Sequence, residues 1–203
     1  MEQEYKWVIP RETLAALAGY LRENGRRLSE NTLHMQAVYY DTVQDDCYRT
    51  GSALRMRREN DRSVCCMKRT IHKEGALAER EEYETEAETL EEGLEQLPAA
   101  GAPADFCLYL RHQQFKELGR TDFIRSCYLL EVGDFTAEFA VDIGSLGKPP
   151  HMVRFEEIEL ELKSGSGDAF RAFAEDLQQQ FALQPQPLSK LARAVRAASE
   201  MQQ

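Results

Sequence analysis

The sequence offers little that could make a zinc site or a disulfide. Its five cysteines are an odd number without a C-x-x-C pair, and its four histidines are scattered with no metal-ligand spacing. It also lacks a recognisable signal peptide and a long apolar run. We therefore expect a reduced, cytoplasmic protein with no zinc site and no membrane-spanning segment.

Positive charge is scarce as well. The 203 residues include 25 lysines and arginines against 35 aspartates and glutamates, which gives a net charge of −10. Nucleic acids and anionic membranes repel such a chain, so we expect neither as a partner, and an anionic ligand would need basic residues gathered locally. With 42% hydrophobic and 30% charged residues, the composition is that of a globular protein, and the length favours a single domain over residues 1–203.

Short strand-like runs fill most of the chain, with amphipathic helices near both ends. After an alternating opening segment, residues 2–9, strands are expected at 35–41, 53–59, 64–70, 77–87, 128–132, 136–143 and 155–163. Helices are expected at 10–25, at 89–97, after a linker at 164–167, and from about Ser189, while 98–103 is expected to be loop and 105–118 is ambiguous.

The most informative pattern is the regular alternation of charged and apolar residues. In five segments the charges share one face of the strand, and the residues are Glu2, Glu4 and Lys6; Arg55 and Arg57; Arg80, Glu82, Glu84 and Glu86; Glu138 and Asp142; and Glu157, Glu159 and Glu161. One interpretation is that each charged face is solvated and the apolar rows form a sandwich core. The other is that the helices cover the apolar rows from outside, so that the charged faces line a barrel with a polar interior. The two helices rich in leucine and phenylalanine favour the second.

A barrel with so many charges inside needs a ligand to balance them. Crowded carboxylates are tolerable mainly when a cation neutralises them, and an all-oxygen set favours Mg²⁺ or Mn²⁺ over zinc. The lysines and arginines alternate in the same way, and arginine binds phosphate oxygens with two donors. The pattern therefore indicates a metal-assisted site for a polyphosphate.

These residues also carry a family resemblance. Glu2-Gln3-Glu4-Tyr5-Lys6 matches the E-x-E-x-K signature of the CYTH proteins, also called triphosphate tunnel metalloenzymes, and later motifs follow in the same order across nearly the whole chain. They are 38–42, 54–57, 67–68, 80–83, Arg125, 139–142, 157–161 and 188–193. The resemblance implies an α+β fold, an eight-stranded antiparallel β tunnel with a charged interior and helices outside, a divalent metal, Mg²⁺ or Mn²⁺, and a small-molecule triphosphate substrate.

The resemblance also implies roles for individual residues. Metal ligands are expected at Glu2, Glu4, Asp142, Glu159 and Glu161. A triphosphate clamp is expected at Lys6, Arg55, Arg57, Lys68, Arg80, Arg125 and Lys190. Lys6, Glu4 and Glu159 are expected to act directly in catalysis, and Glu82 and Glu138 are expected to line the tunnel without an assigned role.

The end of the chain bears on the type of reaction. Leu188-Ser189-Lys190-Leu191-Ala192-Arg193 resembles the S-K-x-x-R ending of bacterial inorganic triphosphatases, whereas the ending typical of class IV adenylyl cyclases is absent. We expect metal-dependent hydrolysis of inorganic triphosphate. The alternatives are a thiamine triphosphatase, a class IV adenylyl cyclase, and a non-catalytic polyphosphate- or nucleotide-binding module; a homodimer stays open.

Overall fold

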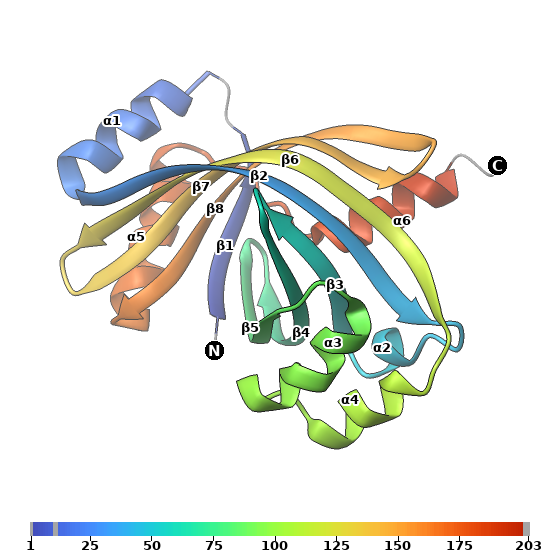
Figure 1. Ribbon diagram of the computed structural model, residues 1–203. Coiled ribbons are helices and arrows are strands. Elements are labelled where there is room, and N and C mark those ends of the chain that lie inside the picture. Colours follow the sequence, from blue (N-terminus) through green and yellow to red (C-terminus); the bar gives the residue numbers. More distant parts are fainter. Residues whose placement is uncertain (1, 10–11, 201–203) are drawn as a thin grey trace.

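Residues 2–9 and 12–200 are described by the computed structural model, and within these ranges eight strands form one closed antiparallel barrel (Figure 1). The strands are β1 (Glu2–Val8), β2 (Arg26–Thr42), β3 (Ser52–Glu59), β4 (Arg62–Glu74), β5 (Leu77–Glu86), β6 (Phe115–Val132), β7 (Phe135–Lys148) and β8 (His151–Gly165). Around the barrel they follow the order β1-β5-β4-β3-β2-β6-β7-β8, and β1 closes it by pairing with both β5 and β8. The α+β tunnel expected from the sequence is confirmed.

Six α-helices accompany the barrel in the described ranges. They are α1 (Leu14–Asn24), α2 (Asp46–Arg49), α3 (Leu90–Gln96), α4 (Ala104–Arg111), α5 (Gly167–Gln180) and α6 (Lys190–Glu200), and a 3₁₀ turn, η1, spans Leu97–Ala100. The short helix expected at 89–97 is confirmed; Thr89 and Glu92 form a reciprocal capping box at its start. None of the helices described is long and apolar enough to cross a membrane.

The main differences from the sequence expectations lie at element ends. β2 and β6 are far longer than the expected runs 35–41 and 128–132, because the first half of β2 is exposed and shows no apolar alternation, while its backbone pairs with β6 throughout. The ambiguous stretch 105–118 contains all of α4 but its first residue, and the start of β6. η1 lies partly in the loop expected at 98–103, and β8 runs through Gly165 into the linker expected at 164–167. Pro10, the first residue of the helix expected at 10–25, lies outside the described residues.

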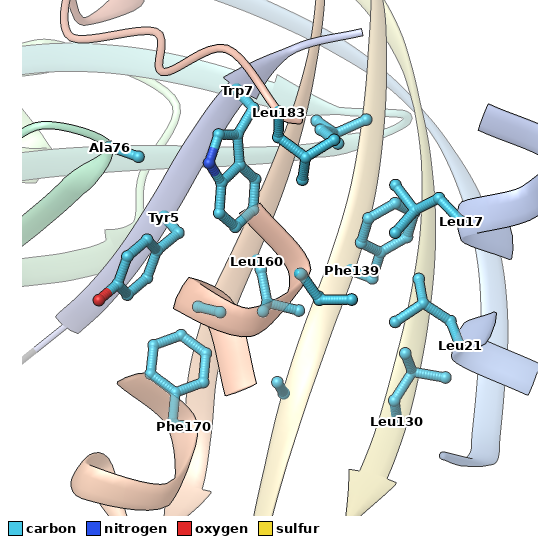
Figure 2. Close-up of a cluster of buried hydrophobic side chains, with 14 of the residues drawn as sticks. Tyr5, Trp7, Leu17, Leu21, Ala76, Leu130, Phe139, Leu160, Phe170 and Leu183 are labelled. Atoms are coloured by element: carbon cyan, nitrogen blue, oxygen red, sulfur yellow. The ribbon is translucent and has the colours of Figure 1, made fainter. Parts of the chain in front are cut away.

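The outward side of β1, β7 and β8 is apolar and is covered by α1 and α5. Tyr5 and Trp7 of β1 point outward and pack with Phe170 of α5, and Leu17 and Leu21 of α1 complete the same cluster (Figure 2). Trp7 is fully buried and its Nε1 donates to Gln178 of α5 at 2.8 Å. Since helices cover the apolar rows from outside, the opposite faces of these strands line the interior.

A second apolar cluster joins α3 and α4 to the outer side of β3 and β4. Cys65 of β4 belongs to it, whereas its neighbour Cys66 points inward beside Glu82. The two cysteines therefore lie on opposite faces of the strand, as neighbours in a strand do, and all five cysteines are buried and free. α3 approaches β4 so closely at Gly93 that an added Cβ would lie 2.2 Å from the Cβ of Cys65.

This close approach gives a test of the packing. Gly93→Ala forces α3 away from β4, and overpacking of this kind costs about 1–3 kcal/mol, more than the gain in helix propensity of about 1 kcal/mol. We expect a lower free energy of unfolding in denaturant titration. Gly19→Ala in α1 is the matched control, because nothing lies within 4 Å of its added Cβ, and it should be neutral or stabilising. Equal effects of the two substitutions would contradict the packing of α3 on β4.

Candidate functional site

The barrel encloses a cavity of about 950 Å³. Its walls come from the inward faces of the strands, and on one side Ser189, which precedes α6, and Lys190 and Leu191 of α6 contribute as well. α6 lies against β6, β7 and β8, with Ala194 packed beside Phe123, Leu146 and Phe155. We call this cavity the lumen.

The alternation seen in the sequence brings nearly all the expected site residues into the lumen. Those lining it are Glu2, Glu4, Lys6, Arg55, Arg57, Lys68, Arg80, Arg125, Glu159, Glu161 and Lys190, together with Glu82 and Glu138. Asp142 differs: it is fully buried beneath its partners Arg125 and Lys190 and is not itself among the lining residues. Strand register sets the rows of side chains, with Glu4 opposite Glu161 and Lys6 opposite Glu159.

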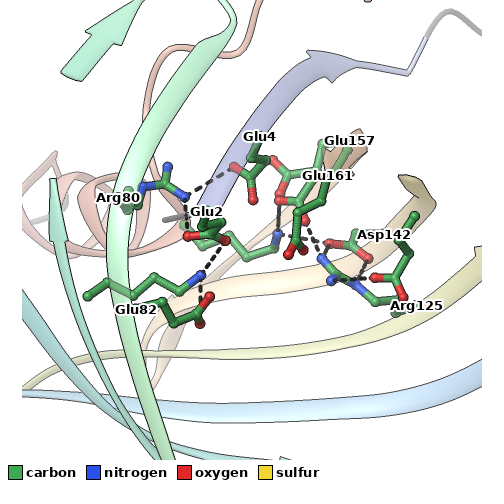
Figure 3. Close-up of polar contacts among 12 residues, drawn as sticks. Glu2, Glu4, Arg80, Glu82, Arg125, Asp142, Glu157 and Glu161 are labelled. Atoms are coloured by element: carbon green, nitrogen blue, oxygen red, sulfur yellow. Dashed lines mark hydrogen bonds and ion pairs between the residues drawn. The ribbon is translucent and has the colours of Figure 1, made fainter. Parts of the chain in front are cut away.

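Close to β1, buried carboxylates meet cations from β4 and β5. Lys68 Nζ lies 2.8 Å from Glu2 and 2.9 Å from Glu82, and Arg80 lies 3.2 Å from Glu4 (Figure 3). Burial raises the pKa of Glu2 to about 7, and the charge of Lys68 only partly opposes this. The Oε2 atom of Glu2 is buried and has no hydrogen-bond donor among the residues described.

A second acidic cluster lies beside α6. Asp142, Glu157 and Glu159 hold carboxylate oxygens within 4.8 Å of one another. Lys190 bridges all three, at 2.8 Å from both Asp142 and Glu159 and in a short ion pair with Glu157. Arg125 binds Asp142 through two hydrogen bonds of 2.8 and 2.7 Å and also contacts Glu159 (Figure 3).

The charges of this second cluster are balanced. Burial works against ionisation of Glu159, but Lys190 and Arg125 hold the pKa of Glu159 well below its usual range. Arg193 of α6 forms a short ion pair with Glu157. The ammonium group of Lys190 therefore occupies the place between carboxylates where a divalent cation would also be stabilised.

The donor set of the lumen fits a hard cation. Its carboxylates offer only oxygen ligands, as Mg²⁺ and Mn²⁺ prefer, and Glu2 Oε2, which lies 3.8 Å from Arg80 and accepts no hydrogen bond among the described residues, leaves one acceptor open. A second group with donor atoms within 4.8 Å consists of Cys66, Glu82 and Glu84. Its carboxylates pair with Lys68, Arg55 and Arg57.

The two arginines of β3 keep a donor free. Arg57 lies 2.8 Å from Glu84 and 2.5 Å from Glu59, and Arg55 lies at longer distances of 3.6 and 3.8 Å from Glu82 and Glu84. The Nε atoms of both guanidinium groups are buried without an acceptor among the described residues. Buried donors of this kind are normally satisfied, so these two point to an anionic ligand in the lumen.

Sequence reasoning missed several members of the site. Glu157 belongs to the same alternating run as Glu159 and Glu161, but only the register of β8 with β7, which sets Glu157 opposite Asp142, shows that it joins that cluster. The sequence marks Arg193 only as the last residue of the terminal motif, 188–193. Lys163 pairs with Glu161 at 2.8 Å and could have been found from the same two-residue period.

Comparison with known families identifies the fold. The protein-family model of the CYTH domain matches residues 1–195 of this chain. The chain belongs to the CYTH family. Among solved structures, a CYTH-like fold is shared with HpAC1 from Hippeastrum, described as an adenylyl cyclase candidate with a dominant triphosphatase activity (18% identity, 98% of this chain and 97% of that one, TM-score 0.65).

Two further structures give the same fold. PH1819 from Pyrococcus horikoshii is 20% identical over 97% of this chain and 99% of its own, with a TM-score of 0.60. A Bacillus halodurans protein described as an adenylate cyclase candidate is 17% identical over 92% of each chain, with a TM-score of 0.55. The family resemblance seen in the sequence is thus confirmed.

The bridging lysine of this CYTH barrel can be tested directly. Lys190→Met leaves three buried carboxylates short of a cation, and breaking a buried ion pair from one side costs about 3–5 kcal/mol. We expect that loss in the free energy of unfolding, measured in a chelator. Lys163→Met is the matched control, since Lys163 is partly exposed and pairs closely with one carboxylate; its loss should stay below about 1 kcal/mol. Similar losses in both variants would refute the bridging role.

Proposed function

We propose that this CYTH protein is a divalent-metal-dependent triphosphatase that hydrolyses inorganic triphosphate to pyrophosphate and phosphate in the lumen. The observation that carries the proposal is the pair of buried, unsatisfied Nε donors on Arg55 and Arg57. Both arginines line the same cavity as the carboxylates of β1 and β8. A site with anion donors on one wall and cation ligands on another suits a polyphosphate with its metal.

In this proposal the cations of the lumen bind and orient the substrate. Arg55 and Arg57 bind phosphoryl oxygens, and Lys68, Arg80, Arg125 and Lys190 extend the clamp across the cavity. Lys6 is buried and forms no ion pair among the described residues, so its ammonium group is free to bind a phosphoryl oxygen. Held in this way, the triphosphate presents its scissile phosphorus to a water molecule for in-line attack.

The carboxylates hold the metal and act on the water. We propose Glu2, Glu4, Asp142, Glu159 and Glu161 as the residues that would hold Mg²⁺ or Mn²⁺. When bound, that cation would neutralise charge at the scissile phosphoryl group. In the pairing of β1 with β8, Glu4 lies opposite Glu161 and Lys6 lies opposite Glu159, so these carboxylates and Lys6 belong to neighbouring rows of the lumen wall. A pure anion binder gains nothing from such carboxylates, which argues against a non-catalytic binding module.

We further propose that residues 1–203 act as one domain in the cytoplasm, since the five cysteines are buried and free. The decisive experiment measures phosphate release from tripolyphosphate, thiamine triphosphate and ATP, each with Mg²⁺, with Mn²⁺ and with a chelator. We expect tripolyphosphate to be cleaved fastest and no cleavage in the chelator. Chromatography of the ATP reaction should show little or no cyclic AMP.

Other results would select another function. Cyclic AMP as the main product, with tripolyphosphate acting only as an inhibitor, would identify a cyclase. Preference for thiamine triphosphate would identify the organic triphosphatase. Tight binding of tripolyphosphate without turnover under any metal would identify a binding module.

Removal of one carboxylate charge tests the metal-holding role. Glu4→Gln keeps the side-chain volume but removes a negative charge from the lumen, and loss of one electrostatic stabiliser lowers turnover about 100-fold or more. Glu81→Gln is the matched control, because Glu81 lies on the outer side of β5 next to Glu82. We expect wild-type turnover from the control. Near-normal turnover of Glu4→Gln at saturating metal would remove Glu4 from the metal site.

A further inference from the structure

A β-bulge in β4 changes which of its side chains face the lumen. Up to the bulge, even-numbered residues such as Lys68 and Thr70 line the cavity. The register with β5 then shifts between Thr70 and His72, so that His72 pairs with Glu79 and Lys73 pairs with Ala78. A bulge inserts one residue and moves every later side chain to the other face.

The register partners of Lys73 and His72 show which of the two faces the lumen and which faces outward. Ala78 is also the register partner of Glu4, which lines the lumen, and it lies two residues from Arg80. Glu79 points the other way, since it binds Arg171 of α5 at 3.3 Å outside the barrel. Lys73 is therefore on the lumen-facing side of the β4–β5 hairpin, where it is exposed and lies beyond the residues that line the cavity, and His72 is on the outer side.

Lys73 is a cation without an acidic partner. Among the residues described it forms no ion pair and no side-chain hydrogen bond, and the same holds for Lys6, whereas Arg80 pairs with Glu4. Burial first, and then the positive charges of Lys6 and Arg80, lower the pKa of Lys73. Three cations thus lie close enough to repel one another at this side of the lumen, and of the three only Arg80 has ion pairs among the described residues, with Glu4 at 3.2 Å and with Glu2 at 3.8 Å.

Such an arrangement is stabilised when an anion joins the cations. A lysine ammonium group is a compact charge with three donors, and it binds phosphate as a point charge. The end of a triphosphate carries more negative charge than its middle phosphoryl group, and it is the part that gains most from several cations. The hairpin side of the lumen offers Lys6, Lys73 and Arg80 for it.

We propose that Lys73 is an additional substrate-binding residue, which joins Lys6 and Arg80 in a subsite for a terminal phosphoryl group. This inference rests on the proposed function, and it assigns one end of the bound triphosphate to the β4–β5 hairpin. Lys73 binds substrate in this account and takes no part in proton transfer.

The experiment compares Lys73→Ala, Lys73→Arg and the adjacent control His72→Ala. For tripolyphosphate, we expect Lys73→Ala to raise KM about 10-fold, which is the loss of about 1.4 kcal/mol of binding, while kcat changes less than twofold. Lys73→Arg should restore most of the affinity, and His72→Ala should match the wild type. Melting temperatures of all variants check that the hairpin stays folded.

A second readout separates this inference from the proposed function. Calorimetry with tripolyphosphate in a chelator measures binding without turnover, and the affinity of Lys73→Ala should fall about 10-fold there too. If the wild type binds but never cleaves tripolyphosphate, the proposed function fails and the affinity loss still supports Lys73 as a binding residue. If Lys73→Ala binds and turns over like the wild type, or if His72→Ala loses as much, the inference is overturned.

Discussion

Mutual neutralisation of charges inside a closed barrel is the constraint on which the rest of the structure depends. Glu157 and Asp142 are fully buried, and the cost of burying such carboxyl groups is offset by the cations that pair with them, Lys190 with both and Arg125 with Asp142. The cations need the carboxylates in turn. Glu82 links Lys68 to Arg55, and Glu84 binds Arg57, so that a chain of ion pairs runs across β4, β5 and β3. A triphosphate with its divalent cation brings both signs of charge together and can replace pairs on both sides.

The outer surface makes this interior possible. Trp7 and Tyr5 of β1 alternate with Glu4 and Lys6, so the same strand supplies a core to α5 and charges to the lumen. Burial of side chains as large as Trp7 contributes about 1.5–3 kcal/mol each, which offsets the cost of gathering charges on the other face. The enclosing helices are therefore part of what keeps a charged cavity of about 950 Å³ stable.

The sequence predicts much of this arrangement because a strand has a period of two residues. Alternation alone places Glu2, Glu4 and Lys6 on one face, and the order of motifs identifies the barrel and its family. Alternation fails where it is interrupted or hidden. The bulge after Thr70 puts Lys73 on the lumen-facing side of the β4–β5 hairpin against the simple count, and the exposed first half of β2 has no apolar alternation at all. Register between strands is also invisible in one sequence, so the contact of Glu157 with Asp142 appears only in the fold.

In the function proposed above, one lumen holds both a divalent cation on its carboxylates and a triphosphate on its arginines. The most direct measurement is anomalous diffraction at the manganese edge, from crystals soaked with Mn²⁺ and a triphosphate analogue whose bridging oxygens are replaced by nitrogen. This account predicts a manganese peak against the carboxylates of β1 and β8 and phosphoryl oxygens within hydrogen-bond distance of the Nε atoms of Arg55 and Arg57. An analogue bound outside the barrel, or a lumen that holds the anion with no manganese peak, would contradict it.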